Sequence, residues 1–225
     1  MNIGTLYIVG TPIGNLQDIT LRALEVLKTA DVIFAEDTRV AKKLLSHYGV
    51  DKRPERYDEH SHARVCERVK ELLRAGRTIA LVTDAGTPGI ADPGTRLVAF
   101  VRAELPGAAI VPVPGPSAIT AALSVAGVSA EHFTFAGYPP HRKGRQTFFL
   151  GLRHATLRPI VLYESPHRIK QTFEYLGQVF GLDAELIVAR ELTKVFEEIF
   201  RGDIKGALEH FRDERGRGEF VVIIP

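Results

Sequence analysis

Cysteine is almost absent from this sequence, whose 225 residues include only Cys66. A single cysteine excludes an internal disulfide bond, and its place among apolar residues of an expected helix makes it a packing residue. Both points fit a reducing compartment, so we expect a cytoplasmic protein.

Long apolar runs are also lacking. The most apolar stretch, residues 105–128, is interrupted by Pro106, Pro112, Pro114 and Pro116. No basic segment followed by an apolar one opens the chain. We therefore expect neither a membrane-spanning helix nor a secretion signal.

Closely spaced metal ligands are missing as well. The nearest two histidines, His60 and His62, are two residues apart, and this spacing does not bring both side chains onto one face of a helix. Solvated polar residues at a helix start explain this pair more simply, so we expect no metal site.

Acidic residues are missing from residues 132–163, although the whole chain has a net charge of only +2. Inside this stretch lies a basic segment, residues 138–145, whose prolines and glycine predict a loop. Its cations suit phosphates, so we expect RNA contact from the charged residues. Phe148 and Phe149 nearby would suit base stacking, but the core is the more ordinary place for them. The alternative for the charged residues is a solvated loop. The RNA-binding candidates of the segment are Arg142, Lys143 and Arg145.

The first half of the chain alternates short β-rich runs with helical patterns. Expected strands at residues 5–9, 32–35 and 78–82 precede expected helices at residues 20–30, 40–48 and 94–103. This alternation predicts a mainly parallel sheet covered by helices. The clearest helix covers residues 61–75, with Ser61 as its candidate cap.

A second set of elements follows Pro116. We expect helices at residues 117–126 and 166–180, strands at residues 133–136, 160–163 and 186–189, and antiparallel or edge strands at residues 198–200 and 220–224. The composition, 45% hydrophobic and 25% charged, is that of a globular protein. We therefore predict two α/β domains, residues 1–114 and 115–225, with a small-molecule crevice between them.

Three loops rich in glycine and proline, at residues 10–18, 83–94 and 113–118, each follow an expected strand, which for the third loop is residues 109–111. Glycine lets the backbone approach a ligand closely, and proline limits collapse of the loop. One such loop ordinarily turns a corner, but three at the carboxyl ends of strands favour one shared ligand site.

An acidic pair, Glu36 and Asp37, follows the expected strand at residues 32–35, and Arg39 lies near enough to pair with one of them. A carboxylate here suits proton acceptance at the ligand edge of the sheet, or it caps the next helix; both roles stay open. For Asp84 and Asp92, beside Gly-Pro turns, we expect mainly hydrogen bonds that fix the loop.

Six segments, in their order along the chain, carry a resemblance to a known family: GTPIGNLQD at residues 10–18, AEDTR at 35–39, DAGTPGIADPG at 84–94, PGPSA at 114–118, YESPHR at 163–168 and RELTK at 190–194. Over almost the whole chain the sequence resembles the ribosomal RNA small subunit methyltransferase I family of the tetrapyrrole methylase superfamily. The chain ends at Pro225, before the helical C-terminal module that many members carry.

The resemblance implies the class III methyltransferase fold, with S-adenosyl-L-methionine in the crevice between two α/β domains, and a homodimer. It implies methyl transfer to the 2′-hydroxyl of a cytidine in the decoding region of 16S ribosomal RNA, within the small ribosomal subunit. For catalysis we single out Glu36, Asp37 and Arg39. The resemblance implies cofactor contacts at Asp84, Gly86, Thr87, Pro88, Ile90, Ser117, Ala118, Tyr163, Leu192 and Gly218.

Two residues of the resembling segments have alternative roles. Ser117 suits a helix cap as well as a ligand contact. Arg168 suits an RNA phosphate, or it pairs with Glu164 four residues before it, which the spacing slightly favours.

Other functions stay open at this stage. A tetrapyrrole C-methyltransferase has the same superfamily fold, although its first loop reads closer to Gly-x-Gly-Pro-Gly-Asp-Pro than the GTPIGNL found here. A non-catalytic RNA-binding or ribosome-assembly factor, or a nucleotide-binding regulator, would keep the crevice without methyl transfer.

Overall fold

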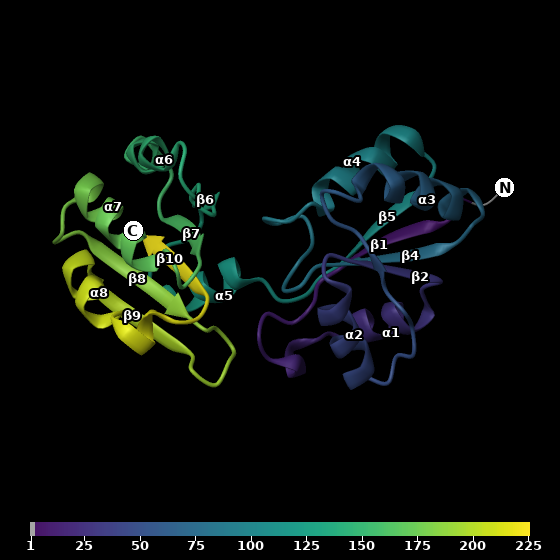
Figure 1. Cartoon of the computed structure of the whole chain (residues 1–225), viewed down its shortest axis with the longest axis horizontal. Helices are drawn as coiled ribbons and strands as arrows, with labels where there is room; N and C mark the ends of the chain where they lie inside the picture. The colour runs from purple at the N-terminus through teal and green to yellow at the C-terminus, as the bar shows by residue number, and fades with distance from the viewer. Residues whose placement is uncertain (1–2) are drawn as a thin grey trace. The chain divides into compact units, whose positions relative to one another are not determined.

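The computed structural model describes residues 3–225 of the chain. The chain divides into two compact units, Met1–Ser117 and Ala118–Pro225. Each unit has its own five-stranded sheet (Figure 1). No helix within residues 3–225 combines the length and the apolar character needed to cross a lipid bilayer.

The N-terminal unit contains an all-parallel sheet in the order β3-β2-β4-β1-β5. Two helices cover each of its faces (Figure 1), α1 and α2 on one and α3 and α4 on the other. Its strands are β1 (Thr5–Val9), β2 (Val32–Ala35), β3 (Glu55–Arg56), β4 (Thr78–Val82) and β5 (Ala109–Val113), and its helices are α1 (Leu21–Thr29), α2 (Thr38–His47), α3 (His62–Arg74) and α4 (Gly94–Glu104).

Alternation along the strands builds both cores of this unit. In β4, Ile79 and Leu81 are buried against α3 and α4, whereas Ala80 and Val82 are buried on the side of α1 and α2. A parallel sheet covered on both faces needs such continuously apolar strands. The expected parallel sheet is therefore confirmed for this unit.

The C-terminal unit contains a mixed sheet in the order β6-β7-β10-β8-β9. Only β6 and β7 pair in parallel; β10 is antiparallel to β7 and β8, and β9 is antiparallel to β8. Helix α5 packs on one face, and α6, α7 and α8 pack on the other. The elements are α5 (Ala118–Ala126), β6 (Thr134–Gly137), α6 (Arg145–Leu152), β7 (Ile160–Glu164), α7 (Ile169–Phe180), β8 (Glu185–Arg190), β9 (Glu198–Asp203), α8 (Ile204–His210) and β10 (Phe220–Ile224).

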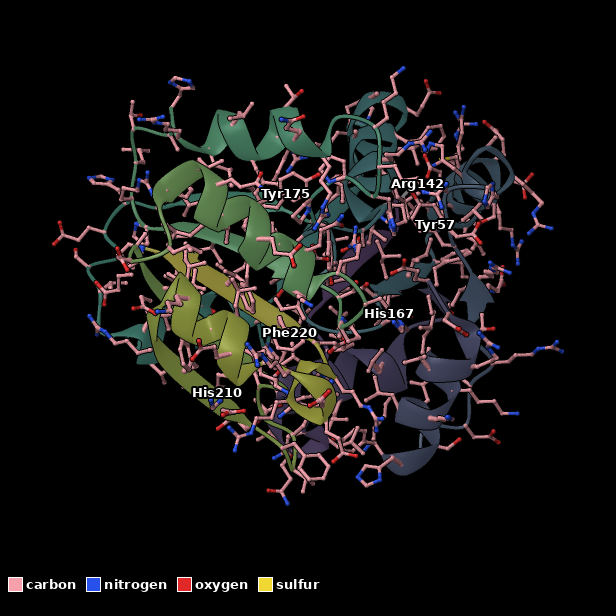
Figure 2. All side chains as sticks on the ribbon, turned by 60° about the vertical axis from the view of Figure 1, so that its left-hand side comes forward. Tyr57, Arg142, His167, Tyr175, His210 and Phe220 are labelled. Atoms are coloured by element: carbon pink, nitrogen blue, oxygen red, sulfur yellow. The ribbon has the colours of Figure 1, made fainter. Side chains whose placement is uncertain are left out.

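Aromatic side chains fill much of the core beneath α7 and α8. Tyr175 on α7 stacks on Phe149 with ring centroids 5.1 Å apart, and Phe220 on β10 contacts Phe211 edge to face at 5.6 Å. Figure 2 labels Tyr175 and Phe220 on these elements. Phe149 is fully buried, which confirms the core position favoured for it over a base-stacking surface.

Several sequence-based expectations differ from the structure. Strand β10 is antiparallel as expected, but it lies in the middle of the sheet rather than at its edge. Ser61 precedes α3 without capping it, because its hydroxyl accepts from the backbone N–H of Asp58. Short elements were missed: β3 has two residues, and α8 has seven.

Candidate active site

The three glycine- and proline-rich loops meet at the carboxyl edge of the first sheet. Thr11 N donates to Gly86 O at 2.9 Å, and Gly86 N donates to Thr11 O at 3.1 Å, which joins the first loop to the second. Thr87 Oγ1 donates to Pro116 O at 3.2 Å, which joins the second loop to the third. The three loops thus lie together at one edge of the sheet, as expected, within the N-terminal unit.

Glycine is required where the first and third loops cross. A Cβ atom on Gly10 would lie 2.8 Å from the Cα atom of Gly115, and one on Gly115 would lie 2.9 Å from Gly10 Cα. No side chain fits at that distance without moving a backbone. The crossing is therefore backbone against backbone.

Asp92 holds the second loop in shape. Its carboxylate accepts hydrogen bonds from the backbone N–H groups of Gly89, Ile90 and Gly94, at distances between 2.7 and 3.1 Å. The loop-fixing role expected for Asp92 is confirmed. Asp84, in contrast, accepts from the backbone N–H of Asp37 at 2.9 Å and so ties the same loop to the end of β2.

A polar cavity of about 1000 Å³ lies beside this loop, at the ends of β2 and β3. The three residues chosen for catalysis line it together, and so does the part of the second loop around Asp92. None of the residues expected to bind the cofactor, all of which the structure describes, lines this cavity. Its lining residues are Glu36, Asp37, Thr38, Arg39, Arg56, Asp58, Glu59, His60, Ala91, Asp92, Pro93, Thr95 and Arg96.

Two acids of this cavity, Glu36 and Asp92, form no ion pair among residues 3–225, whereas Asp37, Asp58 and Glu59 each pair with an arginine. Asp92 is taken up by the backbone N–H groups of its loop, which leaves Glu36. It is half-buried and accepts a hydrogen bond from Thr83 Oγ1 at 3.0 Å. Burial raises the pKa of Glu36; the hydrogen bond from Thr83 opposes this effect, and the negative charges of Asp84 and Asp92 add to it. A carboxylate with a raised pKa at a ligand edge suits proton transfer.

Asp37 and Arg39 form a pair instead. Arg39 Nε donates to Asp37 Oδ1 at 3.0 Å, and the backbone N–H of Arg39 donates to the same oxygen at 2.8 Å, so Asp37 caps α2. These hydrogen bonds hold the pKa of Asp37 well below its usual range. The capping role left open from the sequence is therefore the one that Asp37 performs here.

Residues 3–225 contain no group of three or more histidine, cysteine, aspartate or glutamate side chains placed to bind a metal ion.

In the C-terminal unit, the expected cofactor residues meet at one edge of the second sheet. Tyr163 lies near the end of β7, Leu192 follows β8, and Gly218 precedes β10, which runs antiparallel between those two strands. Tyr163, Leu192 and Ala118 pack against the same core cluster, on the α5 face of the sheet. Burial raises the pKa of Tyr163 to about 12, so its hydroxyl is neutral near pH 7.

The basic segment is anchored by a buried ion cluster around Glu164. Arg145 Nη2 lies 3.1 Å from Glu164 Oε2, and Arg168 Nη2 lies 2.8 Å from Glu164 Oε1. Thr172 Oγ1 donates to Glu164 Oε2 at 2.6 Å and accepts from Arg145 at the same distance. The glutamate side chain has no exposed surface.

Each of the two arginines also holds a carbonyl oxygen of the basic segment. Arg145 Nη1 donates to Pro140 O, and Arg168 Nη1 donates to Pro139 O, both at 3.0 Å. The prediction of RNA contact is thereby corrected for Arg145, which is 2% exposed. Of the two roles left open for Arg168, the structure shows the pairing with Glu164 that the spacing slightly favoured. Arg142 and Lys143 are exposed.

Comparisons with known proteins agree with the order of the motifs. The model of the family Tetrapyrrole (Corrin/Porphyrin) Methylases matches residues 5–207. The ribosomal RNA small subunit methyltransferase I of Halalkalibacterium halodurans is 43% identical over 221 residues, covering 98% of this chain and 75% of that relative. The chain belongs to the ribosomal RNA small subunit methyltransferase I family.

Relatives in this family differ in how much of them the chain covers. The Thermotoga maritima protein of the same name is 40% identical over 222 residues, covering 99% of this chain and 98% of that protein. For the Neisseria meningitidis serogroup B protein the identity is 45%, and 76% of that relative is covered. Some members thus extend beyond the matched region, and others do not.

Solved structures with the same fold match at lower identity. A uroporphyrin-III-C-methyltransferase from Thermus thermophilus matches with a TM-score of 0.69 and 21% identity, covering 98% of this chain and 94% of that one. A diphthine synthase matches with a TM-score of 0.72 and 17% identity, covering 98% and 89%. These matches confirm the predicted fold class and say nothing of substrate.

Two threonines just outside the family segments, Thr83 and Thr172, support these sites and were not predicted from the sequence. Thr83, the partner of Glu36, stands directly before the DAGTPGIADPG motif and carries no signal of its own. Thr172 lies on α7, eight residues after Glu164, and completes the cluster around it. The one sequence signal for this role is its spacing of four residues from Arg168, which puts both on the same side of a helix.

Proposed function

We propose that this chain transfers a methyl group from S-adenosyl-L-methionine to the ribose 2′-hydroxyl of a cytidine in the decoding region of 16S ribosomal RNA. The proposal includes the small ribosomal subunit as the substrate particle, the cytoplasm as its location and a homodimer as the active assembly. The single observation that carries it is the near full-length identity to relatives that bear the ribosomal RNA small subunit methyltransferase I name.

The loops of the N-terminal unit fit a nucleoside-like methyl donor. Thr87 and Ser117 offer hydroxyls from half-buried positions, and Ile90 offers an apolar side chain that is 44% exposed. The backbone crossing of Gly10 and Gly115 sets the spacing of the first and third loops without side chains. A pre-formed loop set lowers the entropic cost of ligand binding. We assign cofactor binding to Asp84, Gly86, Thr87, Pro88, Ile90, Ser117 and Ala118, and further contacts to Tyr163, Leu192 and Gly218.

S-adenosyl-L-methionine, when bound, supplies an electrophilic methyl group on a sulfonium sulfur. The chain's part is to hold the acceptor hydroxyl in line with that methyl group and to exclude water. In that transfer, a bond from the ribose oxygen to the methyl carbon would form as the bond from that carbon to sulfur breaks. The hydroxyl proton passes to the carboxylate of Glu36, whose raised pKa suits that task.

The remaining polar residues have supporting roles in this scheme. Asp37 and Arg39 are bound to each other and fix the start of α2 beside Glu36. Arg142 and Lys143, exposed on the basic segment, contact RNA phosphates.

The test is transfer of radiolabelled methyl from S-adenosyl-L-methionine to small ribosomal subunits that lack the modification, with naked 16S RNA in parallel. We expect label on one cytidine 2′-oxygen of the decoding region. Binding of the cofactor without any transfer would contradict the proposal and favour an RNA-binding factor. Methylation of a porphyrinoid, followed by its absorbance, would favour the tetrapyrrole alternative.

A further inference from the structure

A second cavity of the N-terminal unit is strongly cationic. It has a volume of about 1150 Å³ and lies between the start of α2, the segment of residues 51–56 and the first turns of α3. Seven arginines or lysines line it, against two acids. The cations are Arg39, Lys42, Lys52, Arg53, Arg56, Arg64 and Arg68, and the acids are Asp51 and Glu55. We name it the cationic groove.

Part of this positive charge is already used. Lys52 donates to the carbonyl oxygen of Lys28 at 2.6 Å and to that of Ala30, so it holds the backbone before β2. Arg56 Nε lies 2.6 Å from Asp58 Oδ2, and Arg68 reaches Glu55 only at 3.9 Å. These pairs leave other cations of the groove uncompensated.

Three cations of the groove are exposed and take part in no ion pair within the described part of the chain. They are Lys42 on α2, Arg53 in the segment before β3, and Arg64 on α3. They come from three different elements that converge on one hollow, whose floor includes the buried residues Pro54 and Val65. Unpaired cations around a concave surface concentrate positive potential there and attract a polyanion.

The cationic groove continues into the polar cavity that contains Glu36. Thr38, Arg39 and Arg56 line both cavities. A chain of phosphates lying in the groove would therefore lead directly to the carboxylate proposed to accept the ribose proton. A protein partner has no need of that continuity, whereas a nucleic-acid strand that must place one ribose beside Glu36 does.

We propose that the cationic groove binds backbone phosphates of the RNA strand next to the target nucleotide, with Lys42, Arg53 and Arg64 as the main contacts. This inference rests on the proposed function and adds to it a phosphate-binding surface in the N-terminal unit, separate from the basic segment of the C-terminal unit. Because phosphate contacts carry no base information, the groove positions RNA and does not select the nucleotide.

The test is the salt dependence of RNA binding by the triple variant K42Q/R53Q/R64Q. The slope of log K against log salt is negative, and loss of three phosphate contacts on a single strand reduces its magnitude by about 2. We expect that reduction with a decoding-region RNA fragment, a higher KM for RNA in the transfer assay, and unchanged affinity for S-adenosyl-L-methionine.

The matched control is the triple variant K28Q/R74Q/R102Q. It removes the same charge from exposed positions of the same unit, in the last turns of α1, α3 and α4. An unchanged salt slope in K42Q/R53Q/R64Q, or an equal change in the control, would overturn the inference. So would weaker binding to intact subunits with unchanged binding to the RNA fragment, since the groove would then contact ribosomal protein. Failure of the proposed function is a separate result: no methyl transfer by the unaltered chain.

Discussion

Each unit places a glutamate at the carboxyl end of an interior strand, Glu36 just after β2 and Glu164 at the end of β7, but the two have opposite surroundings. Glu164 has no exposed surface and meets two arginines and a threonine. Glu36 is half-buried beside a cavity, and Thr83 is its hydrogen-bond donor. The sequence context of the two is similar, a strand followed by a helix with an arginine nearby.

The difference separates a structural acid from a chemically available one. Two arginines neutralise Glu164, and the same arginines donate hydrogen bonds to the carbonyl oxygens of Pro139 and Pro140. Glu164 thereby fixes the basic segment through these arginines. No cation neutralises Glu36 within residues 3–225, because Arg39 is bound to Asp37. An acid in the first setting holds a loop, and an acid in the second is free to take a proton.

The largest effect should come from breaking the Glu164 cluster. Glu164→Ala leaves Arg145 and Arg168 without their acid in a buried place, so we expect the free energy of unfolding to fall by about 3–5 kcal/mol. Denaturant unfolding measures this change. Glu185→Ala is the control, since Glu185 pairs with Arg201 at the surface, where loss of a pair costs about 0–1 kcal/mol. Equal costs for the two variants would remove the distinction drawn between buried and exposed acids.

A smaller loss is expected at the crossing that shapes the ligand edge around Glu36. Gly115→Ala places a methyl group 2.9 Å from the backbone of Gly10, and we expect overpacking to cost about 1–3 kcal/mol together with weaker cofactor binding. Gly151→Ala in α6, where a Cβ atom meets open space, should be neutral or stabilising by up to about 1 kcal/mol. Calorimetry of unfolding and of S-adenosyl-L-methionine binding compares them. Normal cofactor affinity in Gly115→Ala would show that this crossing does not shape the site.

The second loop can be tested in the same way. Asp92→Ala leaves the N–H groups of Gly89, Ile90 and Gly94 without their acceptor, and we expect about 1–3 kcal/mol of destabilisation. Faster hydrogen exchange confined to this loop should accompany it. Hydrogen exchange that became faster over the whole N-terminal unit would instead show that Asp92 stabilises the general fold.

The smallest effect concerns Tyr57, a buried residue whose hydroxyl contacts Pro93 in the second loop. Its hydroxyl lies 3.0 Å from Pro93 O and 3.0 Å from His62 Nδ1, and burial raises its pKa to about 12. Tyr57→Phe should cost about 1 kcal/mol, because the ring keeps its packing and one hydrogen-bonding group is lost. A thermal melt measures this cost. A loss as large as that of Glu164→Ala would mean that the hydroxyl carries part of the fold.

Local pattern was enough to predict most strands and the loops, because apolar runs and Gly-Pro punctuation report directly on strands and their ends. Local pattern failed where residues distant in the sequence determine the burial of a side chain or the place of a strand in the sheet. Arg145 looked like its exposed neighbours Arg142 and Lys143 in the basic segment, yet α6 begins at Arg145 and turns it inward to Glu164. Position 220 began a strand of visible β character, but nothing local showed that β10 lies between β7 and β8.

In the candidate site, too, local contacts could be predicted from the sequence and contacts set by the fold could not. Asp92 could be assigned to its loop from the sequence, because its partners are two or three residues away. The choice between Glu36 and Asp37 could not be made, since it depends on which of them Arg39 meets. Pairing of side chains is a property of the fold rather than of the motif.

The most direct test of this account is the single-turnover rate of methyl transfer against pH for the unaltered chain and for Glu36→Gln. Glu36 accepts a proton only when it is ionised, so the rate of the unaltered chain should fall as the pH drops through a pKa above the ordinary glutamate value. Glu36→Gln should bind S-adenosyl-L-methionine normally, lose that acidic limb and react about 100-fold more slowly. An unchanged rate and pH profile in Glu36→Gln would contradict the claim that Glu36 is the chemically available acid.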